Sequence, residues 1–197
     1  MKKILFFALP LLLCMSCEWG TTTNGGDDDS LANDSVIDST VVYEVRGIAG
    51  DGTSMNVLEL ITDGLDTLDI EIPVSMIAGG VQAGDEVDVI YSKTEDGYLA
   101  NIAINTTALQ HLWTQPCSTG GTQSLEISPE GHASTYDMPG VDYDTWSIKN
   151  GQLLLHSPRK AAVESSGYTD TFDILMLTVD TLVLGNNDTH SVFWREN

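Results

Sequence analysis

Apolar and polar residues alternate along most of the chain beyond residue 40, with the period of two that is typical of strands with one buried face. Val87 and Val89, for example, flank Asp88. Hairpin signals such as Asp63-Gly64 and Asp96-Gly97 separate several of these segments. In the first half of the chain the pattern predicts five strands, with a short helical piece at 73–78 after the third. The expected strands are 41–49, 55–61, 65–72, 86–91 and 98–104.

The second half begins with a connector, expected at 106–112, and continues as a run of further short strands. Turn residues such as Pro129-Glu130-Gly131 and Asn150-Gly151 separate them, and no long segment has helical periodicity. Eight short antiparallel strands joined by hairpins predict an up-and-down barrel. The expected strands are 112–114, 123–127, 132–136, 145–148, 153–157, 168–177, 181–184 and 191–195.

Residues 1–17 have the pattern of a bacterial secretory signal. Lys2 and Lys3 precede an apolar run at 4–13, which is too short to span a hydrocarbon core that needs roughly 20 residues. Ser16-Cys17 then resembles the end of a lipobox, and this resemblance implies that the mature chain begins at a Cys17 carrying two or three acyl chains. Cys14 is the rival acceptor, disfavoured by the bulky residue before it. An ordinary secreted protein cut nearby is the alternative.

Residues 18–40 hold few large apolar side chains and include Asp27-Asp28-Asp29, so we expect a disordered acidic tether. Ser30, Ser35 and Ser39 each follow an aspartate. These positions resemble the Asp-Ser/Thr-aliphatic sites that Bacteroidota O-glycosylate, and the resemblance implies glycans along the tether. The alternative is that such pairs are simply common in acidic linkers.

The five-strand order with a helical piece after the third strand matches an OB-like barrel, and another small five-stranded β module is the alternative. An OB-like barrel invites a nucleic-acid hypothesis. The charge argues against it. The chain has 29 acidic and 8 basic residues and a formal net charge of −21, and residues 41–105 contain only Arg46 and Lys93 as cations. A single-strand groove needs clustered positive charge and stacking aromatics. We therefore expect no nucleic-acid partner.

The sequence predicts no catalytic, metal or cofactor site. The four histidines are widely spaced, and neither a Cys-x-x-Cys nor a Gly-x-Ser-x-Gly motif is present. Cys117 has no cysteine partner in the mature chain, so no disulfide is expected. The strongest site candidates are four aromatic residues, Trp113, Tyr136, Trp146 and Trp194. They either line a cavity for an apolar or sugar ring, or plug a barrel whose interior is just filled by side chains.

The second half resembles the lipocalin-like domains of Bacteroidota lipoproteins. The residues that carry this resemblance are Leu112-Trp113, 130–134, 143–146, 151–153, 168–173, 177–184 and Phe193-Trp194-Arg195. The first half resembles the small barrel that often precedes such domains, through Thr53-Ser54-Met55-Asn56 and 83–87. His111 stands where classical lipocalins have the glycine of their N-terminal Gly-x-Trp motif. This difference disfavours the classical lipocalin ligand cavity, which is open at one end of the barrel.

These resemblances imply an all-β chain with a small five-stranded OB-like barrel at 41–106 and an eight-stranded antiparallel lipocalin-like meander barrel at 107–197. We expect a non-catalytic lipoprotein of the cell envelope, anchored in the outer membrane on its periplasmic or surface face. Its partner would be a small apolar or glycan-derived ligand, or a surface protein. The alternative is a structural spacer subunit with no ligand, and a hydrolase is the least favoured interpretation.

Overall fold

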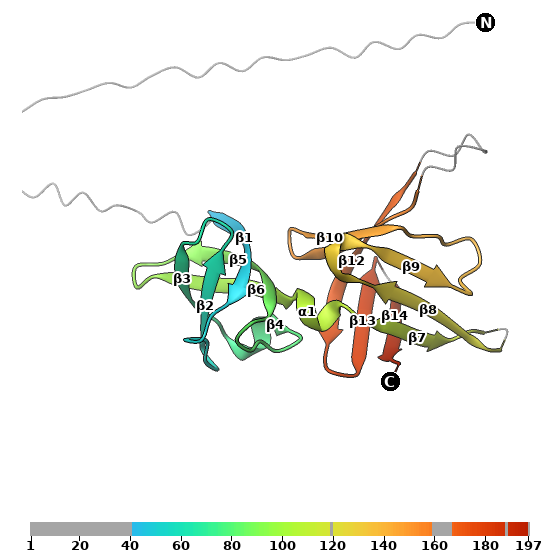
Figure 1. The fold of residues 1–197 in the computed structure, drawn as a ribbon, viewed down its shortest axis with the longest axis horizontal. Coiled ribbons are helices and arrows are strands. Elements are labelled where there is room, and N and C mark those ends of the chain that lie inside the picture. Colours follow the sequence, from blue (N-terminus) through green and yellow to red (C-terminus); the bar gives the residue numbers. More distant parts are fainter. Residues whose placement is uncertain (1–40, 119, 159–166, 188, 197) are drawn as a thin grey trace, which may run out of the picture. The chain divides into compact units, whose positions relative to one another are not determined.

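The first barrel is built from five strands in the order β3-β2-β1-β5-β6 (Figure 1). β3 pairs in parallel with β6 and so closes the sheet on itself. The 3-10 turn η1 and the two-residue strand β4 lie between β3 and β5, and β4 also pairs with β6. This order confirms the OB-like barrel. The elements are β1 Val42–Ala49, β2 Val57–Thr62, β3 Thr67–Glu71, η1 Val74–Met76, β4 Ile77–Ala78, β5 Glu86–Lys93 and β6 Tyr98–Asn105.

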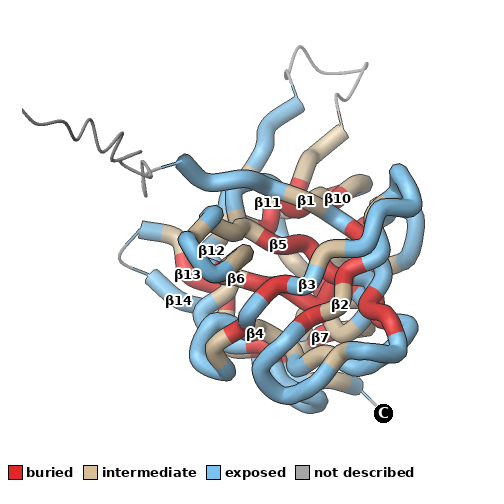
Figure 2. Tube along the Cα trace, turned by 90° about the vertical axis from the view of Figure 1, so that its left-hand side faces the viewer, coloured by how far each residue is buried: buried red, intermediate tan, exposed pale blue. Residues whose placement is uncertain are grey.

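The core of the first barrel follows from the alternation seen in the sequence. Leu58, Leu60 and Ile70 point inward from β2 and β3, and they meet Val87 and Val89 of β5. Figure 2 shows that buried segments alternate with exposed or half-buried ones along β2 and β3. On β2 and β3 one face is therefore apolar and the other meets water, whereas Asp88, between Val87 and Val89 of β5, is itself buried.

Gly47 is a point of close approach between β1 and β2. A Cβ atom placed there would meet the backbone carbonyl of Ile61, which cannot rotate away. We expect Gly47→Ala to lower the free energy of unfolding by about 1–3 kcal/mol, the usual cost of overpacking. The measurement is denaturant unfolding followed by circular dichroism. Gly64→Ala is the matched control, since its Cβ would find only ordinary contacts at 3.7 Å or more. Equal losses in the two variants would contradict the prediction.

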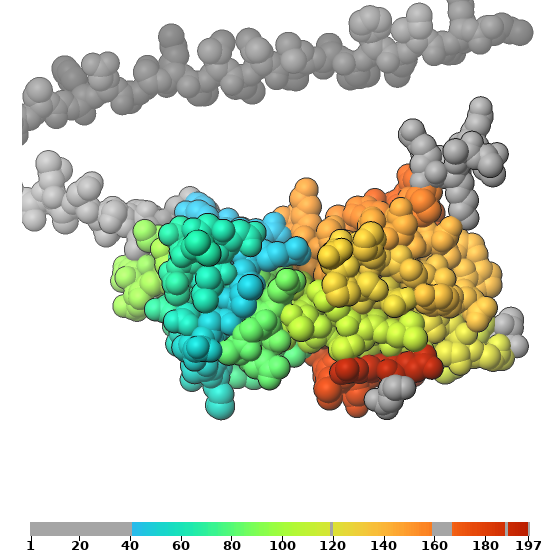
Figure 3. Space-filling model, in the orientation of Figure 1, coloured from blue at the N-terminus to red at the C-terminus, as the bar shows by residue number. Residues whose placement is uncertain are grey.

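The second barrel is a meander of eight strands in the order β10-β11-β12-β13-β14-β7-β8-β9. β14 pairs with β7, and Figure 3 shows the end of β14, in dark red, beside β7. Beside β9 and β10, the bridge His132–Thr145 and the bond from the Ala133 N–H to the Asp144 carbonyl join the two edges, so the barrel is nearly closed. The predicted antiparallel barrel is thereby confirmed. The elements are α1 Thr106–Leu109, β7 Leu112–Pro116, β8 Thr122–Ile127, η2 Pro129–Gly131, β9 Ala133–Tyr136, β10 Thr145–Lys149, β11 Gln152–His156, β12 Thr169–Leu177, β13 Thr181–Asn186 and β14 Thr189–Arg195.

This computed structural model describes residues 41–118, 120–158, 167–187 and 189–196, all of which belong to one compact unit. The predicted signal at 1–17 with Cys17, and the tether at 18–40 with Ser30, Ser35 and Ser39, lie outside the described residues. Within the described part, no helix is long and apolar enough to cross a membrane.

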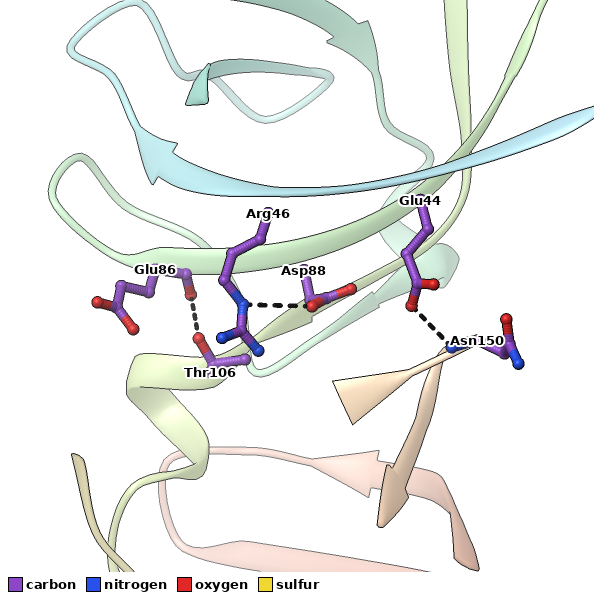
Figure 4. A network of polar contacts seen from close by, with 6 residues as sticks. All are labelled: Glu44, Arg46, Glu86, Asp88, Thr106 and Asn150. Atoms are coloured by element: carbon purple, nitrogen blue, oxygen red, sulfur yellow. Dashed lines mark hydrogen bonds and ion pairs between the residues drawn. The ribbon is translucent and has the colours of Figure 1, made fainter. Parts of the chain in front are cut away.

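The two barrels share apolar and polar contacts. Ile104 of β6 is fully buried in the hydrophobic cluster of the second barrel. The Gly79 N–H donates to the carbonyl of Leu177 at 3.0 Å. Figure 4 shows a further contact, in which the N–H of Asn150, at the β10–β11 turn, donates to Glu44 Oε1 of β1 at 2.7 Å. The first barrel therefore covers part of the second with side chains of β1 and β6.

Candidate functional site

The four aromatic residues that the sequence singles out do not come together. Trp113 is fully buried inside the second barrel, and Trp146 is also buried in that cluster. Their indole Nε1–H groups donate to backbone carbonyls, those of Leu109 and Ser128 respectively, each at 2.8 Å. Tyr136 and Trp194 are each 48% exposed. Two of the four therefore serve the core and two lie outside it, so they cannot line one cavity.

The interior of the second barrel is occupied by side chains. Trp113 packs there with leucines from four strands and with Phe193 of β14. Such filling is expected for a barrel of about eight strands, whose interior is only just wide enough for its own side chains. The buried apolar residues on these strands include Trp113, Leu125, Ile127, Leu153, Leu155, Leu182, Leu184 and Phe193. A cup lined by tryptophans is consequently absent from the described interior.

A cleft of about 420 Å³ lies where α1 joins the two barrels. One wall comes from the segment between β4 and β5 and from the end of β6. The other wall comes from the start of β7, the β12–β13 turn and the end of β14. The lining residues are Gly79, Gly80, Val81, Gln82, Asp85, Asn105, Thr107, Ala108, His111, Thr178, Val179 and Arg195.

Asn105 fixes the first wall of the cleft. Its Oδ1 accepts from the N–H of Ala108 at 2.9 Å and so caps α1, and its Nδ2 donates to the Gly80 carbonyl and to Asp85 Oδ2, both at 2.7 Å. Asp85 Oδ2 also accepts from the N–H of Gln82 at 2.9 Å. Asn105 and Asp85 are both buried. Buried polar groups with these bonds satisfied form a rigid wall.

His111 and Arg195 form the polar part of the second wall. Sheet pairing sets Arg195 opposite Trp113, and the His111 ring lies edge-on to the Trp113 ring with 5.9 Å between centroids. Burial lowers the pKa of His111, and the positive charge of Arg195 lowers it further. The His111 imidazole is therefore biased toward its neutral form beside a permanent cation.

No local pattern in the sequence joins these two residues. In the sequence, His111 is noticed only because it replaces the glycine of the lipocalin Gly-x-Trp motif. Arg195 is noticed only as the last residue of the Phe193-Trp194-Arg195 motif. The two residues come close because β14 pairs with β7, and these two strands are far apart in the sequence. A sequence analysis would have to predict that pairing in order to find the site. Among the described residues, no group of three or more His, Cys, Asp or Glu side chains could hold a metal ion.

Residues 105–196 match the model of the lipocalin-like family. Over these residues the chain is similar to the lipocalin-like family. This match confirms the resemblance seen in the sequence, and we call the second barrel the lipocalin-like barrel. The solved structures that resemble the chain include a lipocalin-like protein from Bacteroides thetaiotaomicron, 25% identical, which matches over 45% of this chain and 97% of its own with a TM-score of 0.40. No curated protein matches the chain significantly.

The lipocalin-like fold suggests a ligand-binding rather than a catalytic protein. Lipocalins usually hold a small ligand inside the barrel. Here the interior of the lipocalin-like barrel is filled, whereas the cleft at its α1 end is open and carries polar side chains.

A buried carboxylate lies outside the cleft, on the face of β5 next to β1. Asp88 is 6% exposed, and its Oδ2 lies 3.4 Å from Nε of Arg46, the ion pair drawn in Figure 4. Its Oδ1 is buried without a hydrogen-bond partner. Burial raises the pKa of Asp88 to about 6, against the opposing charge of Arg46 and with a smaller contribution from Glu44.

The raised pKa of Asp88 predicts a stability that depends on pH. The folded-state pKa of about 6 lies above the unfolded value, so the folded protein binds the proton more tightly. The ionised Asp88 therefore destabilises the fold above pH 6, and stability rises as pH falls from 7 toward 4. We expect Asp88→Asn to raise the unfolding midpoint at pH 7.5 and to flatten its change between pH 7.5 and 5.

Asp88→Asn also removes one negative charge from a very acidic chain. This effect on stability must be separated from the effect of burying the Asp88 carboxylate. Asp69→Asn, at an exposed position on β3, removes the same charge without touching a buried site. The two variants and the wild type are compared by thermal unfolding at pH 5, 6 and 7.5. An unchanged pH profile in Asp88→Asn would show that Asp88 does not carry the dependence.

Proposed function

We propose that this chain is a non-catalytic binding protein of the bacterial cell envelope, which takes a small ligand in the cleft at the α1 end of its lipocalin-like barrel. The observation that carries the proposal is the cleft itself, because its volume of about 420 Å³ falls in the range of small-molecule sites. The filled barrel interior argues for this location. The family match supports binding over catalysis.

The cellular location that we propose is argued from the sequence. Lipidation of Cys17, with acyl chains such as palmitate, would hold the protein at the outer membrane, and the acidic tether at 18–40 would separate the barrels from it. Glycans on Ser30, Ser35 and Ser39 would shield this tether. The test is expression of the full chain with Cys17→Ala beside wild type. We expect the variant to lose palmitate labelling and to leave the membrane fraction, and a variant that keeps both would contradict the anchor.

The ligand we expect is a small glycan-derived or apolar molecule. Native mass spectrometry of the lipidated protein, purified from its own bacterium, tests this while leaving the identity of the ligand open. A reproducible extra mass of a few hundred daltons that dissociates on activation supports the proposal. Protein that carries no such mass, and that binds nothing in a screen of envelope extracts, would contradict it.

A second candidate function is supported by the same filled barrel. Because side chains occupy the described interior of the lipocalin-like barrel, the two barrels could serve as a spacer or accessory subunit of a surface complex, held to a protein partner. In that case chemical crosslinking in intact cells would recover a reproducible partner while native mass spectrometry finds no small ligand. The two measurements together separate the binding and structural functions.

A further inference from the structure

Three of the polar side chains that line the cleft, those of Asn105, Thr107 and Thr178, are already engaged in hydrogen bonds. Asn105 uses both ends of its amide, on Ala108, Gly80 and Asp85. Thr107 Oγ1 accepts from the N–H of Glu86 at 2.8 Å, and Thr178 Oγ1 donates to Asp180 Oδ1 at 2.8 Å. Asn105 and Thr178 therefore shape the cleft but offer a ligand little further bonding capacity, whereas Thr107 keeps its hydroxyl proton as a donor.

Arg195 keeps most of its bonding capacity. Its only described side-chain bond runs from Nη1 to the Val179 carbonyl at 3.4 Å, which is long for a hydrogen bond. In the described part of the chain no carboxylate lies within ion-pair distance of Arg195, although the sequence has 29 acidic residues. A guanidinium with several open N–H groups beside a cleft matches a ligand carboxylate, which can accept two of them at once.

Other groups in the cleft extend this match. The side chains of Gln82 and His111 have no described hydrogen bond, and each can donate one to an oxygen of a ligand. Asp85 uses Oδ2 for both its bonds, so Oδ1 remains as an acceptor for a hydroxyl group. Val81 and Ala108 supply apolar surface for the C–H face of a ring.

Resting on the function proposed above, we propose that the cleft binds a sugar acid, with the carboxylate on Arg195 and ring hydroxyls toward Asp85 and Gln82. The volume of about 420 Å³ accommodates one or two sugar rings. We expect a carboxylate because Arg195 and His111 place open donors on one wall, whereas Asp85 and Gln82 on the opposite wall suit hydroxyl groups.

His111 gives this inference a spectroscopic signature. The charged groups that line the cleft with His111 are Arg195 and Asp85. Burial and the charge of Arg195 lower the pKa of His111 in the free protein. A bound carboxylate would add a negative charge beside the ring, so it should raise that pKa, and its affinity should increase as pH falls toward 5.

The experiment uses the lipid-free mature chain, D-galacturonate as probe and D-galactose as the matched neutral sugar. Binding is measured by calorimetry and by NMR of the His111 ring at pH 6. We expect galacturonate to bind about tenfold or more tightly than galactose and to raise the His111 pKa. Arg195→Gln should weaken galacturonate binding by about tenfold, whereas Lys149→Gln, an exposed cation outside the cleft, should not.

The outcomes separate this inference from the proposed function. Equal binding of the two sugars, or an unchanged affinity in a folded Arg195→Gln variant, would overturn the role of the carboxylate while leaving a ligand-binding cleft. No response of His111 to 50 mM galacturonate would overturn the sugar-acid inference altogether. In that case, native mass spectrometry of the lipidated protein still decides the proposed function.

Discussion

Replacing Trp113 by alanine is expected to lower the free energy of unfolding by about 3–5 kcal/mol, the range for removing a fully buried tryptophan. Trp113 is completely buried on β7, where β14 and β8 flank it. The substitution leaves a cavity that the neighbouring strands cannot fill without changing their pairing. It also leaves the Leu109 carbonyl at the end of α1 without its hydrogen bond from the indole.

Trp194→Ala is the matched control, since the same side chain is removed from a half-exposed position on the outer face of β14. Its loss should change stability by less than about 1 kcal/mol. Both variants are measured by guanidinium unfolding with fluorescence and circular dichroism. Similar losses in the two would show that the interior of the lipocalin-like barrel is less tightly packed than its burial indicates.

Asn105→Ala is expected to lower the free energy of unfolding by about 1–3 kcal/mol, because it removes the cap of α1 and takes one hydrogen bond each from the Gly80 carbonyl and the buried Asp85 carboxylate. The substitution removes the bonds to Ala108, Gly80 and Asp85 together. Since these bonds hold one wall of the cleft, the variant should also show faster amide hydrogen exchange at Gln82 and Ala108.

Asn101→Ala tests whether this effect belongs to the network or to any asparagine on β6. Asn101 is exposed and accepts a single hydrogen bond from Ser92 at 2.8 Å. Its replacement should cost about 0.5 kcal/mol or less and should leave exchange at Gln82 and Ala108 unchanged. If Asn105→Ala were as mild, the wall of the cleft would have to be held by other contacts.

The strands are predictable because their alternation is strong and their turns are chemically distinct. The pattern predicts a strand at 86–91, where β5 spans Glu86–Lys93, and another at 153–157, where β11 spans Gln152–His156. The helical piece at 73–78 is shorter than expected. It ends after η1, since Ile77 and Ala78 turn extended and pair with β6.

The site is harder to predict, for two physical reasons. Alternation shows that neighbours such as Phe193 and Trp194 face opposite sides, but it does not say which one faces the core when both are aromatic. Phe193 takes the interior and Trp194 the exterior. The cleft also depends on the pairing of β14 with β7, and that contact joins the two ends of the barrel sequence. Local alternation carries no information about it.

The burial of Ile104 has a consequence for how the chain can be divided. This side chain belongs to β6 of the first barrel by hydrogen bonding but to the second by packing. A fragment that starts after Asn105 would present an unfilled apolar hollow and an uncapped α1. We therefore expect a fragment that begins at Thr106 to be less stable than one that keeps β6, although the family match itself begins at residue 105.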